Sequence, residues 1–116
     1  MESESFVVLA SRSPRRVELL KQLVDDFTVL PADIDETPHS HEDPVSYVKR
    51  LALEKARAVY MVSDSSAIVI GADTTVDLDG DIFGQPADDN DAREMLRRLS
   101  GTTHQVHTGA AVVNAT

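Results

Sequence analysis

A short segment near the start of the chain, Ser11-Arg12-Ser13-Pro14-Arg15-Arg16, concentrates cations and hydroxyl groups. It follows the apolar run 6–10, and Ser13 with Pro14 is typical of the first residues of a helix. The unpaired N–H groups of a helix start, together with hydroxyl and guanidinium donors, suit a phosphate group. The segment therefore predicts a phosphate site, although a plain helix cap with solubilising arginines is the alternative. It is not a P-loop, because the required glycines and lysine are missing.

Asp73 is a candidate to act on water or to bind a metal ion. It follows the apolar run 67–70, which predicts a buried strand, and we expect it just past the end of that strand. Ligands of open α/β sheets gather beyond the carboxyl ends of strands, and a carboxylate there can bind Mg²⁺ or accept a proton. The alternative is an Asp that only bonds its own turn.

Two further charged residues are candidates for the same site. Glu36 lies in a polar, acidic loop and offers a second carboxylate. Lys55 lies one helical turn from both Leu51 and Val59, so its ammonium group belongs to the apolar stripe of a predicted helix, where it could pair with a phosphate. The alternatives are a solvated loop and a lysine that extends along the apolar surface to reach water.

The elements that would position these residues alternate between strands and helices, which predicts an α/β or α+β domain with a mixed sheet and flanking helices. Residues 1–116 are expected to form a single domain, since the chain has the usual size of one. The expected strands are 6–10, 27–30, 67–70, a hairpin of 76–78 with 82–83, and 104–113. The expected helices begin at Pro14, at Pro44 with an end near Met61, and at Asp89 or Asn90 with an end before Gly101.

The composition of the chain excludes some classes of binding partner and some kinds of site. The chain carries 11 Lys and Arg against 20 Asp and Glu, a net charge of -9, which disfavours general binding to nucleic acid polymers or anionic membranes. It has no Cys, so thiolate metal sites, disulfides and cysteine nucleophiles are excluded. No apolar stretch approaches the ~18 residues of a membrane span, and the start MESESF is unlike a signal peptide. We expect a soluble cytoplasmic protein.

Several motifs in register over nearly the whole chain resemble those of the Maf family, cytoplasmic nucleoside triphosphate pyrophosphatases. The resemblance implies a two-lobed fold with a central cleft, similar to inosine triphosphatase, and hydrolysis of a nucleotide to the monophosphate and pyrophosphate with a divalent metal, Mg²⁺ or Mn²⁺. A homodimer is also implied. The motifs are residues 9–20, Asp35-Glu36-Thr37-Pro38, residues 50–56, Gly71-Ala72-Asp73-Thr74-Thr75-Val76, and Leu99-Ser100-Gly101 with His104, Val106, Thr108 and Gly109.

The resemblance also implies roles for individual residues. Asp73 looks like the proton acceptor that activates the water attacking the α-phosphorus, and Asp73 with Glu36 would hold the metal. The serine, arginines and lysine that bind phosphate in the family correspond to Ser11, Arg15, Arg16 and Lys55 here.

Substrate choice in the family is associated with two positions that carry Arg15 and Thr74 in this chain. This pair resembles the branch that acts on dTTP, UTP and modified uridine triphosphates.

The chain departs from the family pattern in two ways. Gln85 stands in Gly84-Gln85-Pro86 where the family usually has lysine, so a phosphate-binding charge is replaced by a neutral donor. Typical members also continue well beyond Thr116. Two alternatives to an active enzyme follow: a nucleotide-binding or regulatory protein without catalysis, and an inactive fragment of a longer enzyme.

Overall fold

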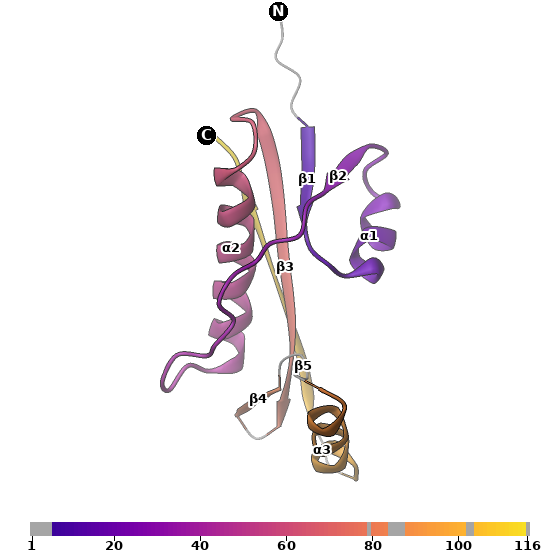
Figure 1. Ribbon diagram of the computed structural model, residues 1–116, viewed down its shortest axis with the longest axis vertical. Helices are drawn as coiled ribbons and strands as arrows, with labels where there is room; N and C mark the ends of the chain where they lie inside the picture. The colour runs from indigo at the N-terminus through magenta and orange to yellow at the C-terminus, as the bar shows by residue number, and fades with distance from the viewer. Residues whose placement is uncertain (1–5, 79, 84–87, 102–103, 116) are drawn as a thin grey trace, which may run out of the picture.

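The computed structural model describes residues 6–78, 80–83, 88–101 and 104–115, which form a five-stranded mixed sheet with helices on both sides (Figure 1). This confirms the predicted mixed α/β sheet with flanking helices. In chain order the elements are β1 Phe6–Ala10, α1 Pro14–Lys21, β2 Phe27–Val29, α2 Pro44–Met61, β3 Ala67–Leu78, β4 Asp81–Phe83, α3 Asp89–Leu99 and β5 Gln105–Val113.

β3 is the central strand, and different partners occupy its two edges. On one edge, β1 pairs in parallel with its first half as far as the pair Ala10↔Gly71, and β4 pairs antiparallel from Val76 onward. β2 extends the sheet beyond β1. On the other edge, β5 pairs antiparallel from Val69 to Asp77. Residues 72–75 of β3 thus lie between the end of the β1 ladder and the start of the β4 ladder.

Helix α2 covers one face of this sheet. Asp43 caps it by accepting a hydrogen bond from the Ser46 N–H, and Pro44 occupies its first turn. Odd-numbered residues of β3 face α2, as the alternation of buried positions shows. The core therefore lies between α2 and the sheet, and its buried members include Val8, Ala10, Leu51, Ala56, Val59, Ala67 and Val69.

Helix α1 lies on the opposite side of the sheet from α2 (Figure 1). Its Ser13 cap and Pro14 start agree with the sequence prediction. None of its residues is buried, and Leu19 is 55% exposed. Leu23, just after the helix, is 83% exposed. The described part of the chain therefore covers the apolar side chains of this segment only in part, since Val17 and Leu20 are half-buried.

Some predicted boundaries were wrong. The strand predicted over residues 67–70 continues to Leu78, because β5 supplies an antiparallel partner along nearly its whole length. Asp73 therefore lies within the strand, not past its end. Asp88 caps α3 in place of Asp89 or Asn90, β2 ends at Val29, and β5 begins at Gln105. Along the described ranges, no helix combines the length and apolar character needed to cross a membrane.

Candidate active site

The turn between β1 and α1 is shaped by its own hydroxyl groups. Ser11 is 4% exposed, and its Oγ accepts a hydrogen bond from the Ser13 N–H at 3.0 Å. The Ser13 Oγ in turn accepts from the Arg16 N–H at 3.3 Å. The Arg16 Nη1 also approaches the Ser11 Oγ at 3.5 Å. These contacts hold the start of α1 and the Arg16 side chain beside the end of β1.

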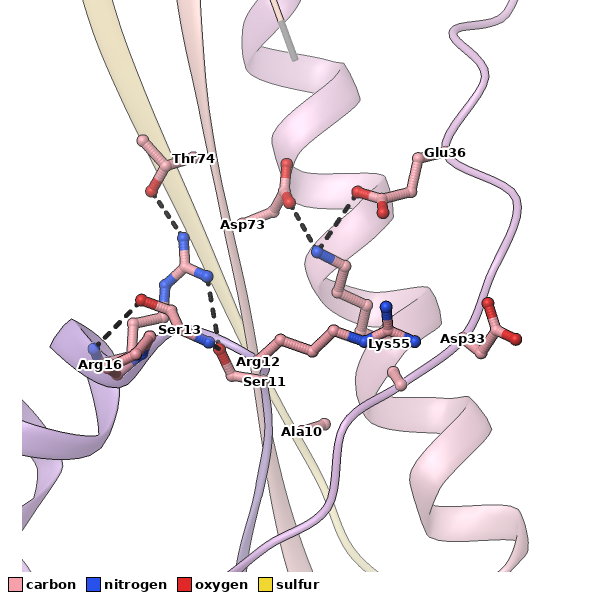
Figure 2. Close-up of a pocket in the computed structure, with 12 residues that line it drawn as sticks. Ala10, Ser11, Arg12, Ser13, Arg16, Asp33, Glu36, Lys55, Asp73 and Thr74 are labelled. Carbon is pink, nitrogen blue, oxygen red and sulfur yellow. Dashed lines mark hydrogen bonds and ion pairs between the residues drawn. The ribbon is translucent and has the colours of Figure 1, made fainter. Parts of the chain in front are cut away.

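This turn forms one wall of a pocket of about 370 Å³. The loop after β2, helix α2 and strand β3 supply the other walls. Figure 2 shows the side chains of Glu36, Lys55 and Asp73 pointing toward one another. The pocket lies along residues 73–74, where β3 has passed the end of the β1 ladder. Its charged lining consists of Arg12, Arg16, Asp33, Glu36, Lys55 and Asp73.

Lys55 and two carboxylates form the centre of the pocket. The Lys55 Nζ lies 2.7 Å from the Asp73 Oδ1 and 3.4 Å from the Glu36 Oε1. The side chains of Lys55 and Asp73 are only 14% and 10% exposed, whereas Glu36 is 52% exposed. Asp73 reaches Lys55 because odd-numbered residues of β3 face α2. An oppositely charged partner offsets the cost of burying a carboxylate.

A second polar chain crosses the sheet on the side of α1. The Arg16 Nη2 donates to the Thr74 Oγ1 at 2.8 Å, and the Thr74 Oγ1 lies 3.1 Å from the Thr108 Oγ1. Thr74 points to the opposite face from Asp73, since the two residues are adjacent in a strand. Arg16 is therefore oriented by β3 and β5 as well as by its own helix.

The structure separates Arg15 from the other predicted phosphate ligands. Arg15 is exposed and lines a neighbouring groove of about 600 Å³ with Leu19, Leu20 and Leu23, not the charged pocket. Consecutive helical residues point about 100° apart, and Arg16 reaches the charged pocket whereas Arg15 does not. Ser13, Arg16 and Thr74 line both hollows. Ser11, Arg16, Glu36, Lys55 and Asp73 do come together, while Gln85 lies outside the described residues.

Asp33 and Thr108 are in or beside the site, although no role was predicted for either and Thr108 appeared only as part of a family motif. Asp33 lines the pocket from the same acidic loop as Glu36, and that shared loop is the only signal that pointed to it. Thr108 pairs with Thr74 across β3 and β5. The residues lie 34 positions apart, so only the strand register reveals their contact.

The donor set fits a hard divalent cation only in part. Across residues 6–78, 80–83, 88–101 and 104–115, no cluster of three or more His, Cys, Asp or Glu is suited to a metal. Asp73 and Glu36 nevertheless approach one point, the Lys55 ammonium. Mg²⁺ is commonly held by one or two carboxylates together with substrate phosphates and water. The two carboxylates could therefore supply only part of the ligand set of a divalent cation.

The chain is similar to known proteins in sequence and in fold. Residues 6–116 match the family model described as "Maf-like protein". A dTTP/UTP pyrophosphatase of Myxococcus xanthus is 53% identical over 109 residues, which cover 94% of this chain and 55% of the relative. A dTTP/UTP pyrophosphatase of Hahella chejuensis is 50% identical over 111 residues, with the same shares. The chain thus spans about half the length of the curated relatives it matches.

A solved structure supports the fold. The Staphylococcus aureus Ham1 protein superposes with a TM-score of 0.54 at 17% sequence identity, over 96% of this chain and 71% of that one. At this identity the likeness shows a common arrangement of strands and helices. It agrees with the expected inosine-triphosphatase-like architecture.

Proposed function

Because the chain belongs to the Maf family, we propose that it acts as a nucleoside triphosphate pyrophosphatase on dTTP, UTP and modified pyrimidine nucleotides. The products would be the nucleoside monophosphate and pyrophosphate. One observation carries the proposal: a nearly buried carboxylate, Asp73, lies in the same pocket as Lys55, Arg16 and the Ser11 turn. The names of the relatives support the choice of nucleotide.

The cations of the pocket would bind the triphosphate. Arg12 and Arg16 come from the turn before and within α1, and Lys55 comes from α2, so positive charge faces the pocket from separate walls (Figure 2). Guanidinium groups can form two parallel hydrogen bonds to phosphate oxygens. Gln85 is proposed to add a neutral donor to the same phosphates. These contacts would neutralise the charge that develops on the leaving pyrophosphate.

Asp73 is proposed to be the general base. Among the described residues, the hydrogen bond to Asp73 reaches only its Oδ1, from Lys55, which leaves Oδ2 available to water. Asp73 would take a proton as the water oxygen bonds to the α-phosphorus. The bond from that phosphorus to the bridging oxygen then breaks, and pyrophosphate leaves with the bonding electrons. The hydrogen bond from Lys55 fixes the direction of the carboxylate.

We also propose a divalent cation, Mg²⁺ or Mn²⁺, held by Glu36 and Asp73 together with the substrate phosphates. When bound, it supplies positive charge that polarises the phosphate group. The activity is proposed to be cytoplasmic, which is consistent with a chain without Cys. Assembly as a homodimer belongs to the same proposal.

Substrate choice is proposed to depend on Thr74 and Arg15. Thr74 lies where the charged pocket meets the groove beside α1, and Arg15 lines that groove. A nucleotide with its phosphates in the pocket can direct its nucleoside toward these two residues. This placement supports a role for them on the pyrimidine side of the substrate.

The test is pyrophosphate release from dTTP and UTP with Mg²⁺, for the wild type and for Asp73→Asn. We expect Asp73→Asn to lose at least about 100-fold in kcat, the usual contribution of a general base, with an unchanged circular dichroism spectrum. Asp77→Asn is the matched control, because Asp77 is on the same strand but lines neither hollow.

Full activity in Asp73→Asn would contradict the assignment of the base. If the wild type binds dTTP but releases no pyrophosphate, the non-catalytic nucleotide-binding alternative holds. That outcome is relevant because the chain spans only about half of its enzymatic relatives.

A further inference from the structure

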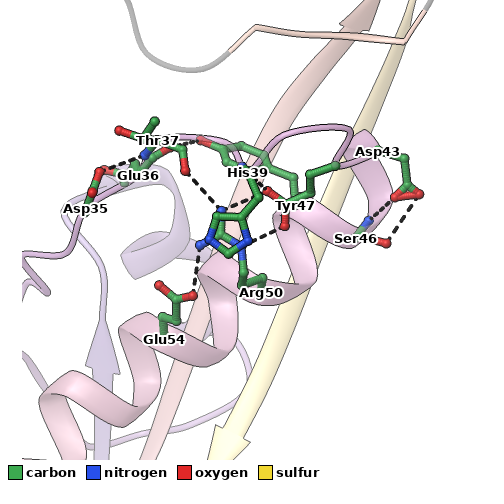
Figure 3. Close-up of polar contacts among 10 residues, drawn as sticks. Asp35, Glu36, Thr37, His39, Asp43, Ser46, Tyr47, Arg50 and Glu54 are labelled. Carbon is green, nitrogen blue, oxygen red and sulfur yellow. Dashed lines mark hydrogen bonds and ion pairs between the residues drawn. The ribbon is translucent and has the colours of Figure 1, made fainter.

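The loop that carries Glu36 is fastened to α2 by a forked ion pair (Figure 3). The Arg50 Nε and Nη2 donate to the two oxygens of Glu42 at 2.7 and 2.9 Å. Arg50 Nη2 also reaches the Thr37 carbonyl oxygen at 3.2 Å. The Glu42 side chain is only 9% exposed. One guanidinium group therefore holds both the start and the end of the segment 37–42.

A tyrosine makes the second attachment, directly on the backbone of Glu36. The Tyr47 hydroxyl donates to the Glu36 carbonyl oxygen at 2.6 Å, and Tyr47 is 4% exposed. Its ring packs with Val48 and Leu51 in the core. Burial, with the negative charges of Asp73 and Glu36 nearby, raises the pKa of Tyr47 to about 12. The hydroxyl stays protonated and remains a donor at neutral pH.

The Glu36 side chain cannot hold the loop by itself. Its contact is an ion pair of 3.4 Å to Lys55 with the carboxylate half exposed. Ion pairs of this kind stabilise very little, because solvent screens them. A fork between nearly buried groups and a short bond from a core tyrosine are stronger constraints. Both attachments come from α2, the helix that also carries Lys55.

We propose that Tyr47 and Arg50 are positioning residues that hold the Glu36 carboxylate beside Lys55 and Asp73, where the metal-bound nucleotide is to bind. Neither residue lines the pocket. Each acts through the backbone or the neighbours of Glu36. The inference rests on the proposed function for the role of Glu36, whereas the attachment of the loop does not depend on it.

The first test compares Glu42 and Glu54, two carboxylates that both accept hydrogen bonds from Arg50. Glu42→Gln weakens the bond from α2 to the loop, whereas Glu54→Gln weakens a bond of 2.9 Å from Arg50 within the helix. Hydrogen exchange of the amides of residues 34–42 is measured in the purified protein without nucleotide. We expect faster exchange, by about fivefold or more, in Glu42→Gln and in Tyr47→Phe, and no change in Glu54→Gln. Equal exchange rates in the wild type and the three variants would overturn the proposal.

The second test asks whether these residues act through Glu36. With dTTP, Tyr47→Phe and Glu42→Gln should each lower kcat/KM about fivefold and raise the Mg²⁺ concentration needed for half-maximal rate. In a Glu36→Gln background the same substitutions should cause no further loss, since interacting residues are not additive. Multiplicative losses would overturn the proposal. If the wild type releases no pyrophosphate, the proposed function fails while the exchange measurement still decides whether the loop is anchored.

Discussion

Lys55 shows how one side chain can be explained only by its partners. The sequence places its ammonium group on the apolar stripe of α2, an unusual location for a charge. The structure supplies the reason: Asp73 reaches it from the centre of the sheet and Glu36 from the loop above. A lysine at this position offsets the cost of burying the Asp73 carboxylate.

For these single side chains, we predict that Lys55→Met lowers the free energy of unfolding more than Asp73→Asn does. The methionine would leave a carboxylate that is 10% exposed without its cation, which we expect to cost about 3–5 kcal/mol. The asparagine is neutral, and it leaves Lys55 with Glu36. Urea unfolding of both variants measures the difference. Lys49→Met, at an exposed position of the same helix, is the control, and an equal loss there would contradict the prediction.

At the scale of elements, α2 and β3 approach unusually closely because two glycines face the helix. A Cβ added at Gly71 would collide with the Ala52 carbonyl oxygen and lie 2.9 Å from the Ala56 nitrogen. At Gly109 of β5, it would lie 2.6 Å from the Val48 carbonyl oxygen. This close approach allows the short side chain of Asp73 to reach Lys55.

Gly71→Ala is therefore predicted to be strongly destabilising, by about 3 kcal/mol or more, because backbone atoms must move to admit the methyl group. Gly101→Ala provides the comparison. It introduces a side chain at φ +73° with nothing within 4 Å, which should cost about 1–2 kcal/mol from backbone strain alone. Thermal unfolding of both variants distinguishes the effects. A milder loss at Gly71 would show that α2 can shift without cost.

The ion pair between Glu42 and Arg50, which attaches the Glu36 loop to α2, makes the stability of the protein depend on pH. The Arg50 hydrogen bonds lower the pKa of Glu42 from 4.5 to about 2, and the His39 N–H adds to this effect. Because the unfolded state takes up the proton first, this contribution is complete above about pH 5 and is lost as the pH falls toward 2.

Consequently the difference in melting temperature between the wild type and Glu42→Gln should shrink as the pH falls from about 6 to about 3. The substitution removes the titrating charge but retains the size of the side chain. Glu54→Gln serves as the control, since its partner is the same arginine. A difference that stays constant with pH would show that Glu42 does not titrate with folding in this way.

Among the described residues of the whole molecule, most of the buried apolar side chains lie on the α2 face of the sheet. Its extents are 58 × 29 × 23 Å, and its radius of gyration is 16.0 Å, against about 13 Å for a compact domain of similar length. Helix α2 buries one face, whereas α1 on the other face buries none of its residues (Figure 1). Stability must therefore come mainly from the α2 side.

We expect Leu51→Ala to cost about 2–5 kcal/mol, because Leu51 is fully buried beneath α2. In contrast, Leu23→Ala should change the free energy of unfolding by less than about 0.5 kcal/mol, since that side chain is 83% exposed. Denaturant unfolding of the two variants at equal protein concentration measures both values. A large effect at Leu23 would mean that another chain covers α1 in solution.

Much of the local structure could be predicted from the sequence, because short-range rules govern it. Ser13 and Pro14 begin α1 as predicted, Asp43 and Pro44 begin α2, and the Asp81–Phe83 strand follows its turn. The charged turn, Glu36, Lys55 and Asp73 were likewise identified by residue type and spacing. Each of these predictions depends on neighbours within about one or two helical turns.

Only the tertiary structure decided which of these residues share a pocket. Asp73 faces Lys55 because β5 pairs along β3 and extends the strand, which no local pattern indicated. Arg16 enters the site while Arg15 turns away, a consequence of how α1 is set against the sheet. The reason is physical: capping and periodicity act between near neighbours, whereas strand register and helix orientation are set by contacts between residues far apart in the chain.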